Sequence, residues 1–128
     1  DRITNERLAS WQRYHDLLEQ LESRGILRRP IVTAGCQHNA HMYYVLLAPE
    51  INRQMVLDEF KLSGIWSVFH YVPLHSSPAG KRYGRTQGKL DVTERHSECL
   101  IRLPLWVGIT ETQQNRVVDV LTHAVCGC

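Results

Sequence analysis

The stretch His41–Gly64, HMYYVLLAPEINRQMVLDEFKLSG, indicates the fold class because it places a buried strand directly before an amphipathic helix. Residues 41–47 are nearly all apolar and rich in aromatic and aliphatic side chains, which is typical of a strand covered on both faces. Pro49 follows this strand, and Asn52 can cap a helix over residues 53–63 that Gly64 would terminate. A strand followed by a packed helix is therefore the predicted centre of the domain.

Upstream of this stretch, an apolar stripe at helical spacing predicts a long helix over residues 3–24, before Gly25. The stripe contains Trp11 and Leu18, and it precedes the predicted sheet by many residues. We expect it to pack on something outside this chain.

Downstream, strands are predicted over residues 66–71 and 100–105, and the Ser, Gly, Pro and basic residues at 76–89 predict an exposed loop. Capping boxes predict two further helices, at Asp91 with Glu94 and at Thr110 with Gln113. The predicted fold class is therefore α+β (or α/β), with a three-stranded sheet packed by helices.

The composition bounds the possible functions. A length of 128 residues with 43% hydrophobic content suits one folded domain, and a net charge of +2 gives no argument for nucleic-acid binding. No apolar run approaches the roughly 20 residues that span a bilayer, so no membrane role is expected. The four cysteines are irregularly spaced and are interpreted as reduced thiols of a cytoplasmic protein. Because the chain starts at Asp1 without Met, we expect it to be cut from a longer protein.

The richest candidate site is the run Phe69–His75, FHYVPLH, with two histidines and Tyr71 around Pro73. Proline ends a strand, so His70 and His75 are expected at a strand-to-loop exit, where ligand-contacting groups are common. Histidine can bond a sugar hydroxyl or a phosphate near neutral pH. The alternative is that one of these histidines only ties down the turn.

Two further clusters give alternative functions. The first consists of Cys36, His38 and His41, whose spacing could place three ligands on one zinc ion, although no second ligand pair follows. The second is the loop at residues 81–89, which has four cations and no acid and could bind an anion through Lys81, Arg82, Arg85 and Lys89, with Tyr83 stacking on a base. A solvated surface loop is the alternative reading of the second cluster.

Together these motifs resemble a known family. The run His38–Tyr44, then Gly64-Ile65, His70–His75 and Leu103–Leu105 resemble the DegT/DnrJ/EryC1/StrS sugar aminotransferases, over essentially the whole chain. The resemblance is greatest to enterobacterial members that aminate a TDP-linked 4-keto-6-deoxyglucose, in His38–Tyr44 and His70–Gly80.

The resemblance implies an aspartate-aminotransferase-type fold, in which a large domain carries pyridoxal phosphate on a lysine and a small C-terminal domain closes the active site at a homodimer interface. Residues 1–24 would be the connecting helix and residues 25–128 the small domain, with the large domain absent. The parent enzyme would transfer an amino group from glutamate to a dTDP-linked keto-sugar, in the synthesis of lipopolysaccharide or enterobacterial common antigen. The implied substrate-binding residues are His70, Tyr71 and His75, then Tyr43 and the basic loop with Arg82 and Tyr83.

The surroundings of the lysines decide whether this chain can form a Schiff base with the cofactor. The sequence contains only Lys61, Lys81 and Lys89, on an amphipathic helix and in the predicted loop. A Schiff-base lysine needs a desolvated, apolar setting that none of these positions offers. We therefore expect no bound pyridoxal phosphate, no catalytic residue and no turnover in this chain alone, and weak nucleotide-sugar binding or none.

Overall fold

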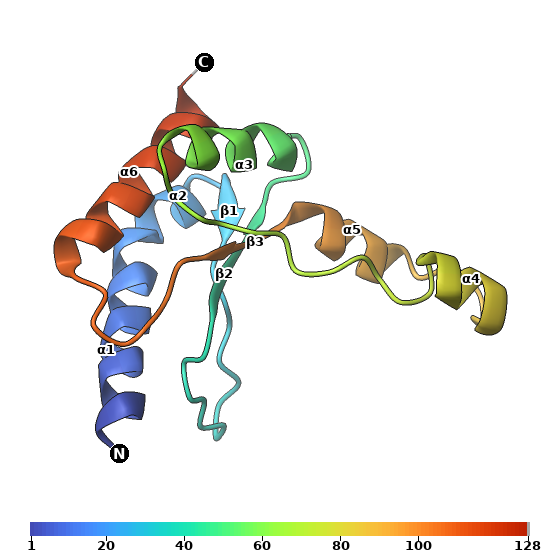
Figure 1. Cartoon of the computed structure of the whole chain (residues 1–128), viewed down its shortest axis with the longest axis horizontal. Coiled ribbons are helices and arrows are strands. Elements are labelled where there is room, and N and C mark those ends of the chain that lie inside the picture. The colour runs from blue at the N-terminus through green and yellow to red at the C-terminus, as the bar shows by residue number, and fades with distance from the viewer. Residues whose placement is uncertain (128) are drawn as a thin grey trace.

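The computed structural model describes residues 1–127. A three-stranded sheet is packed by helices, which confirms the predicted α+β class (Figure 1). The elements in chain order are α1 (Arg2–Leu17), α2 (Glu19–Ser23), β1 (Leu27–Arg28), β2 (Tyr43–Leu47), α3 (Arg53–Leu62), α4 (Pro78–Tyr83), α5 (Asp91–Cys99), β3 (Leu100–Leu103) and α6 (Glu111–Cys126).

The predicted strand β2 forms the centre of the sheet, with order β1-β2-β3 and antiparallel pairing on both sides. Leu27 is paired with Leu47, and Tyr43 with Leu103. The strand predicted over residues 66–71 is wrong, because only Val68 reaches the edge of β3, through a single bridge to Arg102. The short strand β1 takes its place as the third strand.

The predicted helix over residues 3–24 is divided at Leu18 into α1 and α2. Its apolar stripe is covered within this chain, since Trp11, Tyr14 and Leu18 are all buried in the core. The Tyr14 hydroxyl donates to the Pro104 carbonyl at 2.9 Å. The expectation that this stripe packs on something outside the chain is therefore wrong.

Helix α6 lies beside α1 in Figure 1, and the two helices are joined by a buried polar contact. Gln114 is 1% exposed and donates from Nε2 to the Ser10 carbonyl at 2.7 Å. The predicted capping box of Thr110 and Gln113 is confirmed at the start of α6.

The other predicted caps had different outcomes. Asn52 caps α3 as predicted, accepting from two backbone amides. The box predicted at Asp91 is wrong, because Leu90 is the N-cap of α5 and makes no side-chain capping bond, while Asp91 is already helical.

No helix among residues 1–127 is long and apolar enough to cross a membrane.

Helices α4 and α5 form an arm that projects away from the sheet (Figure 1). We define the arm as residues 77–99. Residues 81–89 are exposed as predicted, but the segment predicted as a loop contains α4. Ser77 caps α4 by accepting from the Gly80 amide at 3.0 Å, and Pro78 stands in its first turn. Neither arm helix has a buried residue.

Candidate functional site

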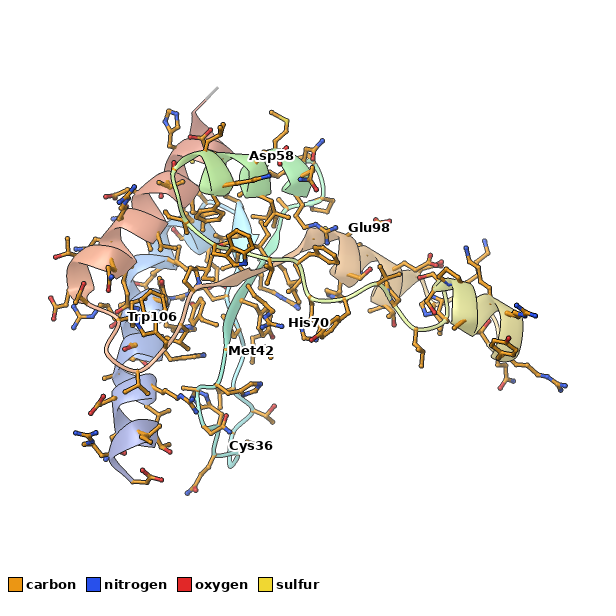
Figure 2. The ribbon with its side chains drawn as sticks, viewed as in Figure 1. Cys36, Met42, Asp58, His70, Glu98 and Trp106 are labelled. Atoms are coloured by element: carbon orange, nitrogen blue, oxygen red, sulfur yellow. The ribbon has the colours of Figure 1, made fainter. Side chains whose placement is uncertain are left out.

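The His70–His75 motif lies on a strap, residues 64–76, which crosses the edge of β3 and runs onto the arm. Figure 2 places His70 close to the region where the arm leaves the sheet. His70 is half-buried and packs edge-on against Tyr71 at 4.8 Å, while Tyr71 itself is 69% exposed. Within residues 1–127, the buried Nδ1 of His70 has no hydrogen-bond partner. A buried ring nitrogen without a partner costs free energy until a water molecule or a ligand group reaches it.

His75 connects the strap to α5. Its Nε2 lies 3.3 Å from Glu94 Oε1, and its side chain is 17% exposed. The contact with the Glu94 carboxylate therefore fixes the orientation of the His75 imidazole.

His75 also lines a groove of about 780 Å³ on the arm, which we call the arm groove. Its lining residues are Leu74, His75, Ala79, Gly80, Lys81, Tyr83, Gly84, Arg85, Thr86 and Leu90. The groove therefore combines apolar and aromatic surface with two exposed cations and an imidazole. Such a lining can bind a flat apolar ring together with an anionic group such as a diphosphate.

Gly80 sets the close approach between α4 and the strap. A Cβ at this position would lie 1.7 Å from the Leu74 carbonyl oxygen, which is a backbone atom that cannot rotate away. Only glycine permits this packing, so Gly80 holds α4 against Leu74 and shapes one side of the arm groove.

Arg82 and Tyr83 are adjacent and exposed at the end of α4. The Arg82 guanidinium lies over the Tyr83 ring, 5.1 Å from its centroid, and Tyr83 is 77% exposed. The arm groove includes Tyr83 but not Arg82 among its lining residues. Arg82 can therefore add positive charge at the rim of the groove.

Tyr43 lies apart from these residues, in the core. It is 0% exposed, and its hydroxyl is 3.4 Å from His15 Nδ1. Burial raises the pKa of the Tyr43 phenol well above its usual value, so the hydroxyl stays protonated. Tyr43 therefore acts on any ligand only through neighbours such as His15.

Sequence reasoning missed a second groove, of about 540 Å³, between α1 and the segment after β1. Trp11, His15 and Arg29 line it, with the two rings stacked at 4.8 Å. Arg29 donates from Nε to Glu22 Oε2 at 2.6 Å, and burial together with the charge of Arg29 lowers the pKa of His15. The only signal in the sequence was that Trp11 and His15 share a helix face.

The zinc alternative gains no support from the geometry. Within residues 1–127, no three His, Cys, Asp or Glu side chains form a group that could hold a metal ion. His38 packs edge-on against Trp11 at 4.7 Å, and His41 Nδ1 is 2.9 Å from Asn39 Oδ1. Cys36, Cys99 and Cys126 are free thiols, and Cys128 lies outside the described residues.

Comparison with solved structures identifies the fold. An aminotransferase, TlmJ from Streptoalloteichus hindustanus, superposes with a TM-score of 0.83 over 98% of this chain and 32% of its own, at 22% identity. A second structure, ntda from Bacillus subtilis with bound cofactor PMP, gives a TM-score of 0.77 over 96% and 28%, at 21% identity. The chain thus has the fold of a part of an aminotransferase.

Sequence comparison defines the family. Residues 1–122 match the DegT/DnrJ/EryC1/StrS aminotransferase family, and the chain belongs to it. It is 28% identical over 125 residues to dTDP-3-amino-3,4,6-trideoxy-alpha-D-glucose transaminase of Micromonospora megalomicea subsp. nigra, covering 94% of this chain and 32% of that protein. It is 30% identical over 121 residues to dTDP-4-dehydro-2,3,6-trideoxy-D-glucose 4-aminotransferase of Saccharopolyspora spinosa, covering 94% and 30%. The chain therefore spans about a third of the length of these relatives.

The lysines of this chain do not fit pyridoxal phosphate, the cofactor that the family implies. Lys61, Lys81 and Lys89 are all exposed, the first on α3 and the others on the arm. An exposed lysine lacks the desolvated, apolar surroundings that a Schiff-base lysine needs.

Proposed function

We propose that this chain is the C-terminal domain of a sugar aminotransferase and that it closes the active site over a dTDP-linked sugar. The proposal is supported by the family match over residues 1–122 and by the two relatives, whose names describe dTDP-sugar aminotransferases. The parent protein would be a cytoplasmic homodimer that transfers an amino group from glutamate to a 4-keto-6-deoxy sugar. Its product would serve cell-surface polysaccharide synthesis, in the enterobacterial case the common antigen.

The arm groove and the strap are the part of the chain that we assign to the substrate. Lys81 and Arg85 carry positive charge into the groove, where a diphosphate would lie, and Arg82 adds charge at the rim. Tyr83 offers an exposed ring on which a thymine base can stack.

The sugar itself we assign to the strap. His75, oriented by Glu94, can exchange hydrogen bonds with sugar hydroxyls, and Tyr71 exposes a phenol on the same strap. The Nδ1 of His70, which is buried and unpartnered among the described residues, would reach a hydroxyl only when the strap moves to uncover it. Tyr43 contributes to the core of the domain rather than to direct contact with the sugar.

The cofactor chemistry belongs to the missing domain in this proposal. When bound there, pyridoxal phosphate would supply the electron sink for amino transfer. This chain would bind and orient the sugar nucleotide and exclude water as it closes. It would not hold the cofactor, because all three of its lysines are exposed. Alone, it would be inactive.

A titration of the isotopically labelled chain with dTDP, followed by NMR, tests the assignment. We expect weak binding in fast exchange, with shifts concentrated in residues 70–90, and a further loss of affinity in Arg85→Gln. Arg24→Gln is the matched control, since Arg24 is exposed at the end of α2, away from the arm. Shifts centred on the groove at Trp11, or an absence of shifts, would contradict the proposal.

The same titration tests the alternative of an independent anion-binding module. Tight binding by the isolated chain, lost when the four loop cations are removed, would favour that module over a domain that holds only part of a site.

A further inference from the structure

A further groove, of about 470 Å³, is formed by the beginning of the strap, the turn after β3 and the first turns of α6. Two tryptophans line it, Trp66 at 83% exposed and Trp106 at 46%, and we call it the two-tryptophan groove. In Figure 2, Trp106 lies toward α6, whereas His70 lies toward the arm. The groove contains none of the residues that we assign to the sugar nucleotide, and its volume is within the roughly 300–1,000 Å³ typical of small-molecule sites.

Both indole rings are carried by ordered backbone. Trp66 stands between Gly64, which follows α3 with a φ of 71°, and Val68, which pairs with β3. The carbonyl of Trp106 accepts from the amide of Ile109, a residue of the core, at 3.3 Å. Each ring therefore presents a fixed apolar surface to solvent, on which a planar ring can stack.

The two polar side chains of the groove are also held in place. Gln113 accepts at Oε1 from the Thr110 amide at 2.9 Å and from the Thr110 hydroxyl at 3.1 Å. Arg116 donates from Nη2 to the Ser63 carbonyl at 2.8 Å. These bonds leave the amide N–H groups of Gln113 and the Nε and Nη1 groups of Arg116 for a ligand.

The hydrogen-bonding side chains of the groove, among the residues that the structure describes, offer donors. An indole and a guanidinium have no acceptor, and the acceptor of Gln113 is committed to the capping box. A neutral sugar would leave its own hydroxyl donors without partners here, whereas a carboxylate or phosphate needs only donors. No acid is present among these lining residues, and Arg116 supplies a positive charge.

We propose that the two-tryptophan groove binds a planar aromatic ring that carries an anionic group. The ring stacks on an exposed indole, and the anion accepts hydrogen bonds from Arg116 and Gln113. A nucleoside monophosphate and an aromatic carboxylate share this chemistry. The site is additional to the sugar-nucleotide site that we assign to the strap and the arm groove.

The test is an NMR titration of the isotopically labelled chain with adenosine monophosphate and, separately, with indole-3-acetate. The indole N–H resonances report the location, because the arm groove has no tryptophan among its lining residues. We expect shifts for Trp66 and Trp106 and none for Trp11, which is 6% exposed and lines a different groove. Adenosine and ribose 5-phosphate should each bind more than about tenfold more weakly than the monophosphate, because one lacks the anion and the other the ring.

Two variants test the residues. Trp66→Ala and Arg116→Gln should each weaken binding by more than about tenfold, and both positions are exposed, so the fold should be retained. Trp66→Phe keeps an aromatic ring and should retain most of the affinity. Arg24→Gln removes the same charge as Arg116→Gln at an exposed position outside the groove and should have no effect.

The outcomes separate the sources of the ligand and the two sites. Binding of the nucleotide alone, or of the carboxylate alone, supports the proposal and identifies which source the groove prefers. Equal affinity for adenosine monophosphate and ribose 5-phosphate, shifts confined to residues 70–90, or no shift of either indole with both probes would overturn it. The dTDP assignment is tested separately, because its expected shifts lie in residues 70–90.

Discussion

Tyr14→Ala is expected to be among the most damaging single changes in the chain, because this side chain joins α1 to the rest of the domain. The ring is 0% exposed and lies 5.3 Å from the ring of Tyr43, and its hydroxyl donates to the Pro104 carbonyl at 2.9 Å. Truncating a fully buried aromatic residue costs about 3–5 kcal/mol in the free energy of unfolding. Tyr14→Phe keeps the ring and removes only the hydrogen bond, at a cost of about 1 kcal/mol.

Urea unfolding followed by circular dichroism measures both values, with the m-value as a check on two-state behaviour. Tyr44→Phe is the matched control, since Tyr44 is half-buried on the opposite face of β2 and should change stability by no more than about 0.5 kcal/mol. A loss below about 1 kcal/mol for Tyr14→Ala would refute the reasoning, because α1 would then be a connecting helix with little part in the core.

Three further predictions concern a cap, a titration and a backbone contact. Thr110→Ala removes the capping box of α6 and should lower the free energy of unfolding by about 1 kcal/mol, measured by the same urea experiment; Thr93→Ala on α5 is the control that should not. The pKa of His15 is lowered in the folded state by burial and by Arg29, so the folded chain binds fewer protons than the unfolded chain below the ordinary value of 6.5. Stability should therefore be fully present above that pH and fall on acidification below it, and His15→Gln should flatten this part of a stability-against-pH curve; an unchanged curve would contradict the assignment. Gly80→Ala should displace α4 and weaken dTDP binding in the NMR titration, because it places a Cβ against the Leu74 carbonyl. Thr93→Ala, at an exposed position of α5 outside the groove lining, should not.

The parts of the fold that follow from local chemistry were predictable from the sequence. Strand β2, the Asn52 cap and the Thr110 box each depend on residues within a few positions of one another. The third strand was misplaced because β1 has only two residues, too few for a pattern, and is defined by its pairing with Leu46 and Leu47. The covering of Trp11 and Tyr14 by the sheet and α6 is a long-range contact that no local pattern reveals.

The candidate site also has parts that could be predicted from local sequence and parts that could not. The strap and the basic segment were recognisable from their residue types, and the structure places His75, Lys81, Tyr83 and Arg85 along one groove. The contact between His75 and Glu94 spans 19 positions and follows from the folding of the arm. Tyr43 has a residue type that suits a ligand, but its position in the central strand places it in the core.

The central proposal is that this chain contributes one side of the sugar-nucleotide site, whereas another domain of the whole protein holds the aminotransferase cofactor. The most direct measurement is to mix the purified chain with pyridoxal phosphate, reduce with borohydride and locate any adduct by mass spectrometry. The account predicts at most sparse labelling spread over Lys61, Lys81 and Lys89, since all three are exposed. A stoichiometric adduct on a single lysine would contradict it.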